Sequence, residues 1–191
     1  MMLSERDNRV LNLIHKFGNV STSQIQVLCG FPKGSACRRR LGQLYENKLV
    51  KKSKRNMGAE NIFYIDKLLR YAEHRLKLVD FYIALVKFAE QSSSVKLLRF
   101  DVEPVDYGEV IPDAYVEIAV SGDKYKIFVE VHMSYEYQAF DQAKYEKLYC
   151  VWKDKVFPRV VILSERTVKI QQSDIKYIVL GGNYKIYEIF K

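Results

Sequence analysis

Cysteine and histidine are scarce in this sequence: each occurs only three times in 191 residues. The cysteines, Cys29, Cys37 and Cys150, are odd in number and lie mostly in apolar patterns, which is typical of reduced thiols rather than of a disulfide framework. The histidines lie far apart and have no metal-finger spacing with the cysteines. We therefore expect neither a disulfide-stabilised secreted scaffold nor a structural zinc site.

Long hydrophobic runs are also lacking. No segment approaches the roughly 18 consecutive apolar residues that a membrane-spanning helix needs, and the first nine residues contain no apolar signal segment. We expect a soluble cytoplasmic protein without a membrane partner. Because 48% of the residues are hydrophobic, the chain can bury one sizeable core or two small ones.

Positive charge is distributed unevenly along the chain. Residues 1–65 contain 12 lysines and arginines and 4 aspartates and glutamates, whereas the whole sequence has 31 and 23, so residues 66–191 hold 19 of each. The net charge of +8 therefore belongs entirely to the first third. A clustered basic face attracts a polyanion because binding releases the counterions condensed on its phosphates. The asymmetry favours two domains, of which the first binds nucleic acid. The alternative, a solvated surface that keeps the protein soluble, is more typical of scattered charges.

The segment that begins at Lys33 has the pattern of an amphipathic helix. At 3.6 residues per turn, the side chains of Cys37, Leu41 and Leu44 share one face. The opposite face carries the polar residues that we expect nearest to DNA base edges: Ser35, Arg38, Arg39 and Gln43. Gly42 also lies on this face. Glycine inside a helix costs about 1 kcal/mol relative to alanine, so we expect either a close backbone approach or a tight packing contact there.

A basic hairpin follows this helix. Its two short strands are expected at 49–50 and 62–65. The connection between them carries the cations that we expect to meet DNA phosphates or a minor groove: Lys51, Lys52, Lys54 and Arg55.

Two further helices are expected before the basic one. Ser4 is suited to cap a first helix that ends at Gly18. Ser21 and Gln24 fit the capping box of a second, shorter helix. Three short helices and a hairpin within residues 1–65 predict a winged helix-turn-helix domain, whose third helix enters the major groove of double-stranded DNA. A protein-interaction module with an incidental basic surface is the alternative.

Residues 66–91 are expected to form a connecting helix, with Asp66 as its cap. Its apolar residues form two stripes, so the helix has two packing partners. One stripe is expected to cover the sheet that follows, and the other to meet the N-terminal domain or a second copy of the helix. The pattern lasts about two and a half heptads, which is too short to establish a coiled coil by itself. A homodimer through this helix or through the C-terminal domain is therefore an open alternative.

Residues 92–191 alternate between strand and helix patterns. One helix is expected at 135–153, and strands are expected at 95–100, 110–120, 125–133, 159–163, 177–180 and 184–190. This order predicts an α/β (α+β) domain with a mixed sheet and helices on its faces.

Alternation along two of these strands brings polar residues to one sheet face, because side chains two residues apart point the same way. Asp113 on one strand and Glu130 and His132 on the next share that face. Pro112-Asp113 followed by Glu130-Val131-His132 resembles the Pro-Asp…Asp/Glu-x-Lys signature of the restriction-endonuclease-like nuclease superfamily, whose core has the same order of elements. The resemblance implies that Asp113 and Glu130 are metal ligands for Mg²⁺ or Mn²⁺ in phosphodiester cleavage, with His132 at the position of the catalytic lysine.

His132 departs from that signature in its chemistry. A lysine with a pKa near 10.4 is charged at neutral pH, whereas a histidine with a pKa near 6.5 is mostly neutral. Lys126 on the same face, or Lys144 on the next helix, could replace the missing cation. Paired carboxylates also occur on ordinary wet or ion-paired sheet faces. We therefore expect an inactive nuclease-like domain used in assembly, and keep metal-dependent DNA nicking or cleavage as the alternative.

Several short motifs extend this likeness over most of the chain. They are the N-terminal winged helix, the connecting helix, the Pro-Asp pair that ends at Asp113, the carboxylates Glu130 and Glu136, and a Lys/Tyr-rich helix over 141–149. Together they make the chain similar to the replication-relaxation proteins of bacterial plasmids and related mobile elements. The resemblance implies a sequence-specific DNA-binding protein in replication, DNA relaxation or transcriptional control. Replication proteins would be its partners, and binding itself would need no cofactor.

Overall fold

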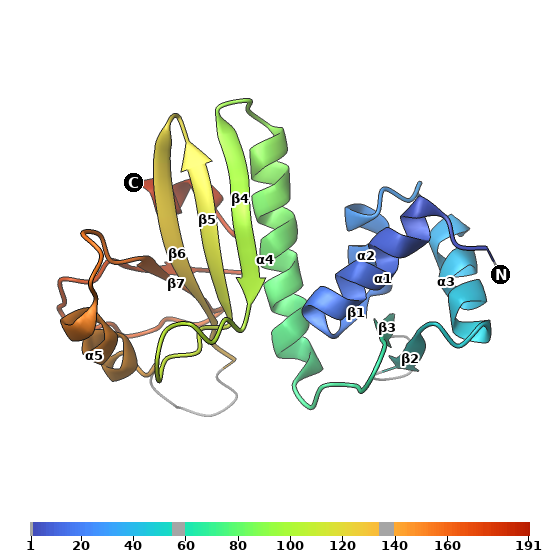
Figure 1. Cartoon of the computed structure of the whole chain (residues 1–191), viewed down its shortest axis with the longest axis horizontal. Helices are drawn as coiled ribbons and strands as arrows, with labels where there is room; N and C mark the ends of the chain where they lie inside the picture. Colours follow the sequence, from blue (N-terminus) through green and yellow to red (C-terminus); the bar gives the residue numbers. More distant parts are fainter. Residues whose placement is uncertain (1, 55–59, 134–139) are drawn as a thin grey trace. The chain divides into compact units, whose positions relative to one another are not determined.

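The computed structural model describes residues 2–54, 60–133 and 140–191. The chain forms two compact units, Met1–Ile83 and Ala84–Lys191 (Figure 1). The division falls inside helix α4 (Ala72–Glu90), whereas the sequence predicted boundaries at either end of a connecting helix. Each part of α4 contributes to its own unit, because Gln24 bonds Leu76 in the first and Phe88 stacks on Phe190 in the second.

Unit 1 contains three helices and a small antiparallel sheet. Its elements are α1 (Glu5–Phe17), β1 (Val20–Ser21), α2 (Thr22–Leu28), α3 (Ala36–Glu46), β2 (Lys51–Lys54) and β3 (Asn61–Tyr64), followed by the first part of α4. The strands lie in the order β1-β3-β2. The first hairpin strand, predicted at 49–50, is instead β2 at Lys51–Lys54, and the second, predicted at 62–65, is β3 at Asn61–Tyr64. Lysines expected in the connection therefore lie in β2 and pair with β3.

The predicted helix caps of unit 1 are confirmed. The Ser4 hydroxyl accepts from the backbone N–H of Asp7, whose carboxylate accepts from Ser4 in return. Ser21 and Gln24 form the same reciprocal arrangement at α2. These bonds satisfy amide groups that the first turn of a helix leaves without helical partners.

The core of unit 1 follows the predicted helical spacing. The side chains that fill it are almost or completely buried: Val10, Leu13, Ile14 and Phe17 from α1, Ile25 from α2, and Cys37, Leu41 and Leu44 from α3. Because the apolar face of α3 is used up in this core, its other face is left at the surface.

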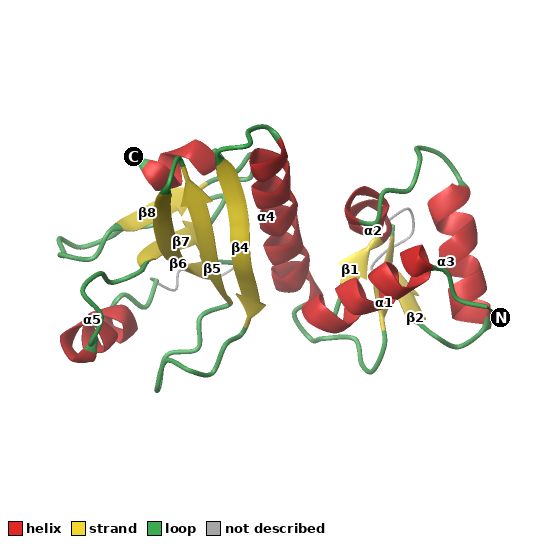
Figure 2. Ribbon diagram, turned by 45° about the horizontal axis from the view of Figure 1, so that its top comes forward, coloured by secondary structure: helices red, strands yellow, loops and turns green. Residues whose placement is uncertain are grey.

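Unit 2 is built on a mixed five-stranded sheet (Figure 2). Its elements after α4 are β4 (Val95–Val102), β5 (Ala114–Val120), β6 (Asp123–Val131), α5 (Ala143–Val151), β7 (Arg159–Leu163), β8 (Tyr177–Leu180) and the short 3₁₀ helix η1 (Ile186–Phe190). The sheet order is β4-β5-β6-β7-β8, antiparallel from β4 to β6 and parallel from β6 to β8. The chain is therefore an α/β protein with a mixed sheet.

One predicted strand is wrong, and several predicted boundaries move. Residues 184–190 form η1 rather than a strand, because Ile186 and Ile189, three residues apart, are the buried side chains there. The connecting helix begins at Ala72 instead of Asp66. The predicted strand 110–120 starts only at Ala114, after a proline that has no N–H for the sheet. Within the predicted helix 135–153, the structure has α5 at Ala143–Val151. Residues 134–139 lie outside the described part.

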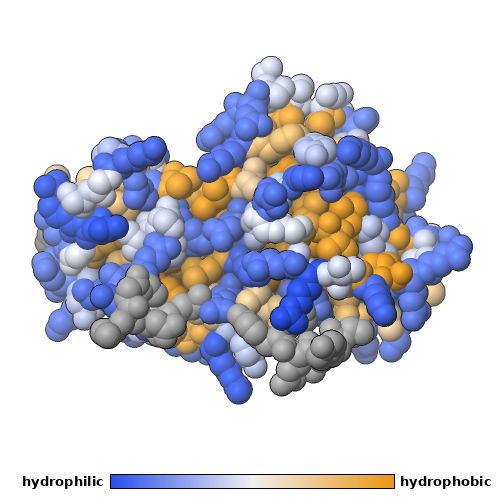
Figure 3. Space-filling view, turned by 180° about the vertical axis from the view of Figure 1, so that it is seen from behind, coloured by the Kyte–Doolittle hydropathy of each residue, from blue (hydrophilic) through white to orange (hydrophobic). Residues whose placement is uncertain are grey.

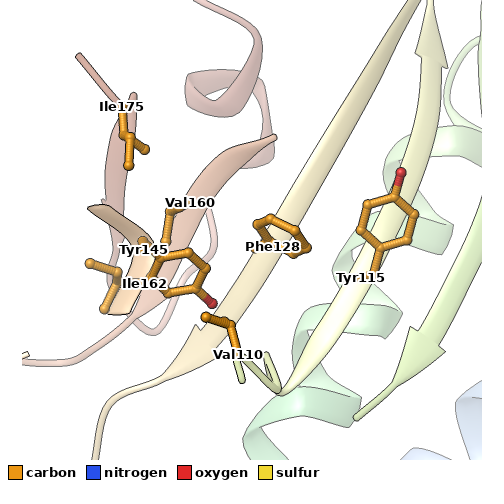
Figure 4. Packing of buried hydrophobic residues seen from close by; sticks show 7 residues of the cluster. All are labelled: Val110, Tyr115, Phe128, Tyr145, Val160, Ile162 and Ile175. Atoms are coloured by element: carbon orange, nitrogen blue, oxygen red, sulfur yellow. The ribbon is translucent and has the colours of Figure 1, made fainter. Parts of the chain in front are cut away.

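One face of the sheet in unit 2 carries an aromatic core cluster: Val110, Tyr115, Phe128, Tyr145, Val160, Ile162 and Ile175 (Figure 4). Tyr115 and Phe128 are paired neighbours on β5 and β6, with ring centroids 5.8 Å apart. Their shared face confirms the alternation predicted for these strands. α5 contributes the fully buried Tyr145, which fixes this helix against the sheet.

Figure 3 shows hydrophilic side chains over much of one face of the molecule, with hydrophobic patches among them. Over the described ranges, no helix combines the length and the apolar character that crossing a bilayer requires.

Candidate nucleic-acid interface and carboxylate cluster

The exposed face of α3 is polar along its length. Ser35 stands at the N-cap position but makes no side-chain bond to the helix. It is exposed, as are the three other predicted base contacts, Arg38, Arg39 and Gln43. A Cβ atom built at Gly42 would meet no described atom within 4 Å. The tight packing contact considered for Gly42 is therefore wrong, and this glycine leaves a patch of open helix backbone on the polar face.

One side of α3 borders a concave surface of about 400 Å³, which we call the hairpin-side hollow. It lies between α2, α3 and the β2–β3 hairpin, and its lining residues are Thr22, Ser23, Gln26, Arg38, Gly42, Lys52, Lys54, Glu60, Asn61 and Phe63. Three of the predicted DNA-contacting cations, Arg38, Lys52 and Lys54, thus gather around one hollow.

Alternation along β2 separates neighbouring lysines. Lys52 and Lys54 line the hollow, whereas Lys51 lies on the other face of the strand and its Nζ donates to the backbone oxygen of Asp66 at 2.7 Å. The Nζ of Lys52 lies 4.1 Å from the centroid of the Tyr45 ring, a cation–π contact that holds it beside α3. The structure therefore brings Lys52 and Lys54 together with α3, but not Lys51.

One carboxylate is built into the hairpin-side hollow. The Glu60 oxygens Oε2 and Oε1 accept hydrogen bonds from the backbone N–H and the hydroxyl of Ser23, each at 2.9 Å. These bonds tie the hairpin to α2 and so maintain the shape of the hollow. Glu60 offsets one of the three cations, which leaves the surface with an excess of positive charge.

The other side of α3 borders a second concave surface of about 760 Å³, the α1-side hollow. Its lining residues are Ser4, Glu5, Arg6, Asp7, Arg9, Phe31, Pro32, Ala36, Arg39, Arg40 and Gln43. Arg39 and Gln43 lie here rather than with Arg38, because successive helical residues are rotated by about 100°. The predicted contacts of α3 are thus divided between two hollows.

An ion pair between the buried Asp7 and the partly exposed Arg40 forms one wall of the α1-side hollow. Asp7 is fully buried. Its Oδ1 accepts from Arg40 Nε at 2.7 Å, and its Oδ2 accepts from Arg40 Nη2 at 2.5 Å and from the Ser4 hydroxyl at 2.6 Å. Hydrogen bonding to Arg40 holds the pKa of Asp7 far below its usual range. Arg40 Nη1 also donates to Gln43 Oε1 at 2.7 Å, so the Gln43 side chain is held in position.

Sequence reasoning missed this pair, although two signals were present. Arg38, Arg39 and Arg40 are consecutive, and three consecutive helical residues span about 200°, so one of them had to turn toward the protein. Asp7 follows Ser4 by three residues, which is the spacing of a capping box and places its carboxylate close to the backbone.

A second group of charged residues lies in unit 2. The register of β5 and β6 ends at the pair Ala114 and Val129, and its continuation by one residue places Asp113 across from Glu130. Asp113 Oδ2 accepts from the backbone N–H of Val131 at 2.7 Å. Glu130 Oε1 accepts from Lys144 Nζ at 2.7 Å and from the Tyr145 hydroxyl at 2.5 Å. The structure therefore brings the two predicted carboxylates together and adds two groups from α5.

Burial is the main cause that raises the pKa of Glu130, and the charge of Asp113 raises it further. Lys144 acts in the opposite direction by favouring the charged carboxylate. The pKa of Tyr145 is raised because its hydroxyl is buried beside Glu130. Tyr145 therefore serves as a hydrogen-bond donor near neutral pH.

The two cations considered as substitutes for the missing lysine have different positions. Lys126 Nζ lies 2.8 Å from Asp154 Oδ2 and is engaged there, whereas Lys144 reaches Glu130. His132 extends the sheet by donating its backbone N–H to Leu163 at 2.9 Å. Across the described ranges, no three His, Cys, Asp or Glu side chains form a group suited to holding a metal ion.

Two predicted residues lie outside the described part of the chain: Arg55 of the hairpin and Glu136 after β6. Comparison of the sequence with protein-family models and with curated proteins, and of the fold with solved structures, gives no match. The function is therefore inferred from the arrangement of these residues.

Proposed function

We propose that unit 1 is a winged helix that binds double-stranded DNA through α3 and the β2–β3 hairpin. The observation that carries the proposal is the hairpin-side hollow, where Arg38 from α3 meets Lys52 and Lys54 from β2. A helix with an exposed polar face, flanked by a cationic hairpin, suits a major groove bordered by phosphates. Open backbone at Gly42 supports close approach of a ligand to the helix.

The biological setting of this binding is also a proposal. We propose that the protein acts on a plasmid or another mobile element, in replication, DNA relaxation or transcriptional control, as the resemblance to replication-relaxation proteins suggests. Unit 2 would then be a nuclease-like domain used in assembly, as a homodimer or with replication proteins. Exposed apolar side chains in unit 2 support an assembly role: Val105, Val151 and Val156 are each about 70% exposed. Light scattering of the full chain over a concentration series tests the homodimer.

Fluorescence anisotropy with labelled duplex oligonucleotides tests the DNA-binding proposal. The full chain should bind duplex DNA with an affinity that falls linearly with the logarithm of salt concentration. Arg38→Ala should weaken binding by about 1–3 kcal/mol and relax specificity at one base position if Arg38 contacts a base edge. Lys67, an exposed lysine of unit 1 that lines neither hollow, provides the matched control. Equal binding by wild type and Arg38→Ala would contradict the assignment of α3.

Metal-dependent DNA nicking is the second candidate, and the Lys144–Glu130 contact favours it. Lys144 would provide the positive charge of the lysine that His132 replaces in the signature, beside two carboxylates whose oxygens are suitable ligands for Mg²⁺. A bound metal would activate water for attack on a phosphodiester. The chain's own contribution would be orientation of Glu130 by Lys144 and Tyr145, and of Asp113 by the Val131 amide.

Supercoiled plasmid incubated with the protein and Mg²⁺ or Mn²⁺ distinguishes the two candidates. Nicking that is lost in Asp113→Ala, Glu130→Ala and Lys144→Ala would establish the enzyme. Tight binding without nicking would leave the DNA-binding protein with an inactive nuclease-like domain, which is the result that we expect.

A further inference from the structure

We infer that the α1-side hollow is a second phosphate-binding surface, in which Arg6 and Arg9 contact the DNA backbone on the side of α3 opposite to the hairpin. This inference rests on the proposed DNA binding and extends it to a helix outside the predicted contacts. It assigns the two hollows to the two phosphate backbones that border a single major groove.

The first support for this inference is the position of α3 between the two hollows. Arg38 and Gly42 face the hairpin-side hollow, while Arg39 and Gln43 face the α1-side hollow. The exposed ridge of the helix therefore has a concave surface on each side. A helix with its side chains is about 10–12 Å across, and a major groove is about 12 Å wide. A helix seated in the groove thus meets one backbone on each side.

The second support is the net positive charge of the α1-side hollow. Four arginines and two carboxylates line it. Asp7 is paired with Arg40, which leaves Arg6, Arg9 and Arg39 against the single carboxylate of Glu5. An exposed hollow with this excess of guanidinium groups suits a phosphate, which arginine binds with good geometry.

The third support is that contacts with α3 and with the segment before it fix the position of α1. The ion pair between Asp7 and Arg40 joins the first turn of α1 directly to α3. The guanidinium of Arg6 lies 5.0 Å from the ring centroid of Phe31, which adds a second contact between α1 and the segment before α3. Arg6 is exposed on this anchored turn, and Arg9, three residues further along α1, is also exposed. Cations held in place before binding lose less conformational freedom when a phosphate arrives.

Salt-dependent binding of the full chain to a duplex that it binds tests the inference. In Arg6→Gln/Arg9→Gln, the slope of log affinity against log salt should fall by about two, because about one phosphate contact is lost with each arginine. At 0.1 M salt, binding should weaken about five- to tenfold per contact, equally for all duplex sequences. Arg6→Lys/Arg9→Lys keeps the charge and should retain the salt slope, which separates lost charge from lost packing on Phe31.

Phosphate ethylation interference provides the decisive readout. Wild type should be blocked by ethylation at phosphates on both backbones that border the groove, and Arg6→Gln/Arg9→Gln should lose only one of these two clusters. The inference would be overturned if this variant retained both clusters and the full salt slope. The proposed function would remain intact if Arg38→Ala and Lys52→Ala still weakened binding. Absence of duplex binding by the wild type would overturn both. Circular dichroism of the variant confirms that it is folded.

Discussion

The two units use the same charged residue types in opposite ways. In unit 1, Arg38, Lys52 and Lys54 line a surface hollow. In unit 2, cations pair with carboxylates, as Lys144 does with Glu130, Lys124 with Glu117 and Lys126 with Asp154. This matches the charge distribution, since all of the net +8 lies in residues 1–65 and the rest of the chain is neutral. Charge that is balanced inside a unit supports its structure, whereas charge in excess is available to a partner.

The largest expected effect concerns the ion pair of Asp7 and Arg40, which supports the structure of unit 1. Asp7→Ala should destabilise unit 1 by about 2–3 kcal/mol, because it removes charge-assisted hydrogen bonds at a fully buried position. Chemical unfolding followed by circular dichroism measures this. The exposed pair of Arg99 and Asp101 in unit 2 is the matched control, and Asp101→Ala should cost less than about 1 kcal/mol. Equal effects of the two substitutions would remove the distinction between the pairs.

Substitution of Arg38 has the next largest expected effect, the 1–3 kcal/mol of DNA affinity given above. Arg99→Ala in unit 2 sharpens the comparison, because this arginine is engaged with Asp101. Selection of binding sites from random duplexes should show altered preference at one position for Arg38→Ala and an unchanged site for Arg99→Ala. A changed DNA sequence preference for Arg99→Ala would indicate that DNA contacts unit 2.

A glycine substitution should separate stability from binding within unit 1. Gly42→Ala should stabilise the protein by about 1 kcal/mol, because alanine favours a helix and the new methyl group meets no described atom. The same methyl group would project into the hairpin-side hollow and should weaken DNA binding. Thermal unfolding and anisotropy on the same preparation test both parts. Unchanged DNA affinity would show that the ligand does not approach this backbone.

Asp7 and Glu130 should contribute to the pH dependence of stability with opposite signs. The lowered pKa of Asp7 means that its contribution is complete above about pH 4 and is lost as the pH falls through its folded-state pKa. The raised pKa of Glu130 means that the folded state holds its proton longer, so stability decreases as the pH rises from the unfolded pKa to the folded one. Glu130→Gln should remove this decrease and leave the contribution of Asp7 unchanged. A profile unchanged by this substitution would contradict the buried, charge-coupled environment of Glu130.

Local patterns were sufficient for much of the fold. Both capping boxes depend on residues three positions apart, and the buried face of α3 follows from helical spacing, so the sequence contains them directly. The shared face of Tyr115 and Phe128 likewise follows from strand alternation. The mixed sheet and the order of its elements as far as β8 were also predicted, because strand and helix patterns alternate clearly after residue 92.

Long-range pairing accounts for what the sequence did not predict. Asp7 and Arg40 are 33 residues apart, and no local pattern links them. The choice of Lys144 over Lys126 depends on how α5 packs on the sheet. The separation of Lys51 from Lys52 is local alternation, but it could not be predicted while the strand was expected at 49–50 instead of Lys51–Lys54. η1 forms where a strand was expected because burial by the surrounding unit outweighs the local strand preference of its residues.

The neighbouring lysines of β2 give the most direct test of DNA binding by unit 1, since Lys51 and Lys52 have the same charge and lie on opposite faces of one strand. Affinity of full-length Lys51→Ala and Lys52→Ala for duplex DNA is measured over a salt series. Lys52→Ala should weaken binding to all sequences alike and lower the salt slope by about one, whereas Lys51→Ala should leave the slope unchanged. Equal slopes for both variants, or no duplex binding by the wild type in dilute salt, would contradict the account.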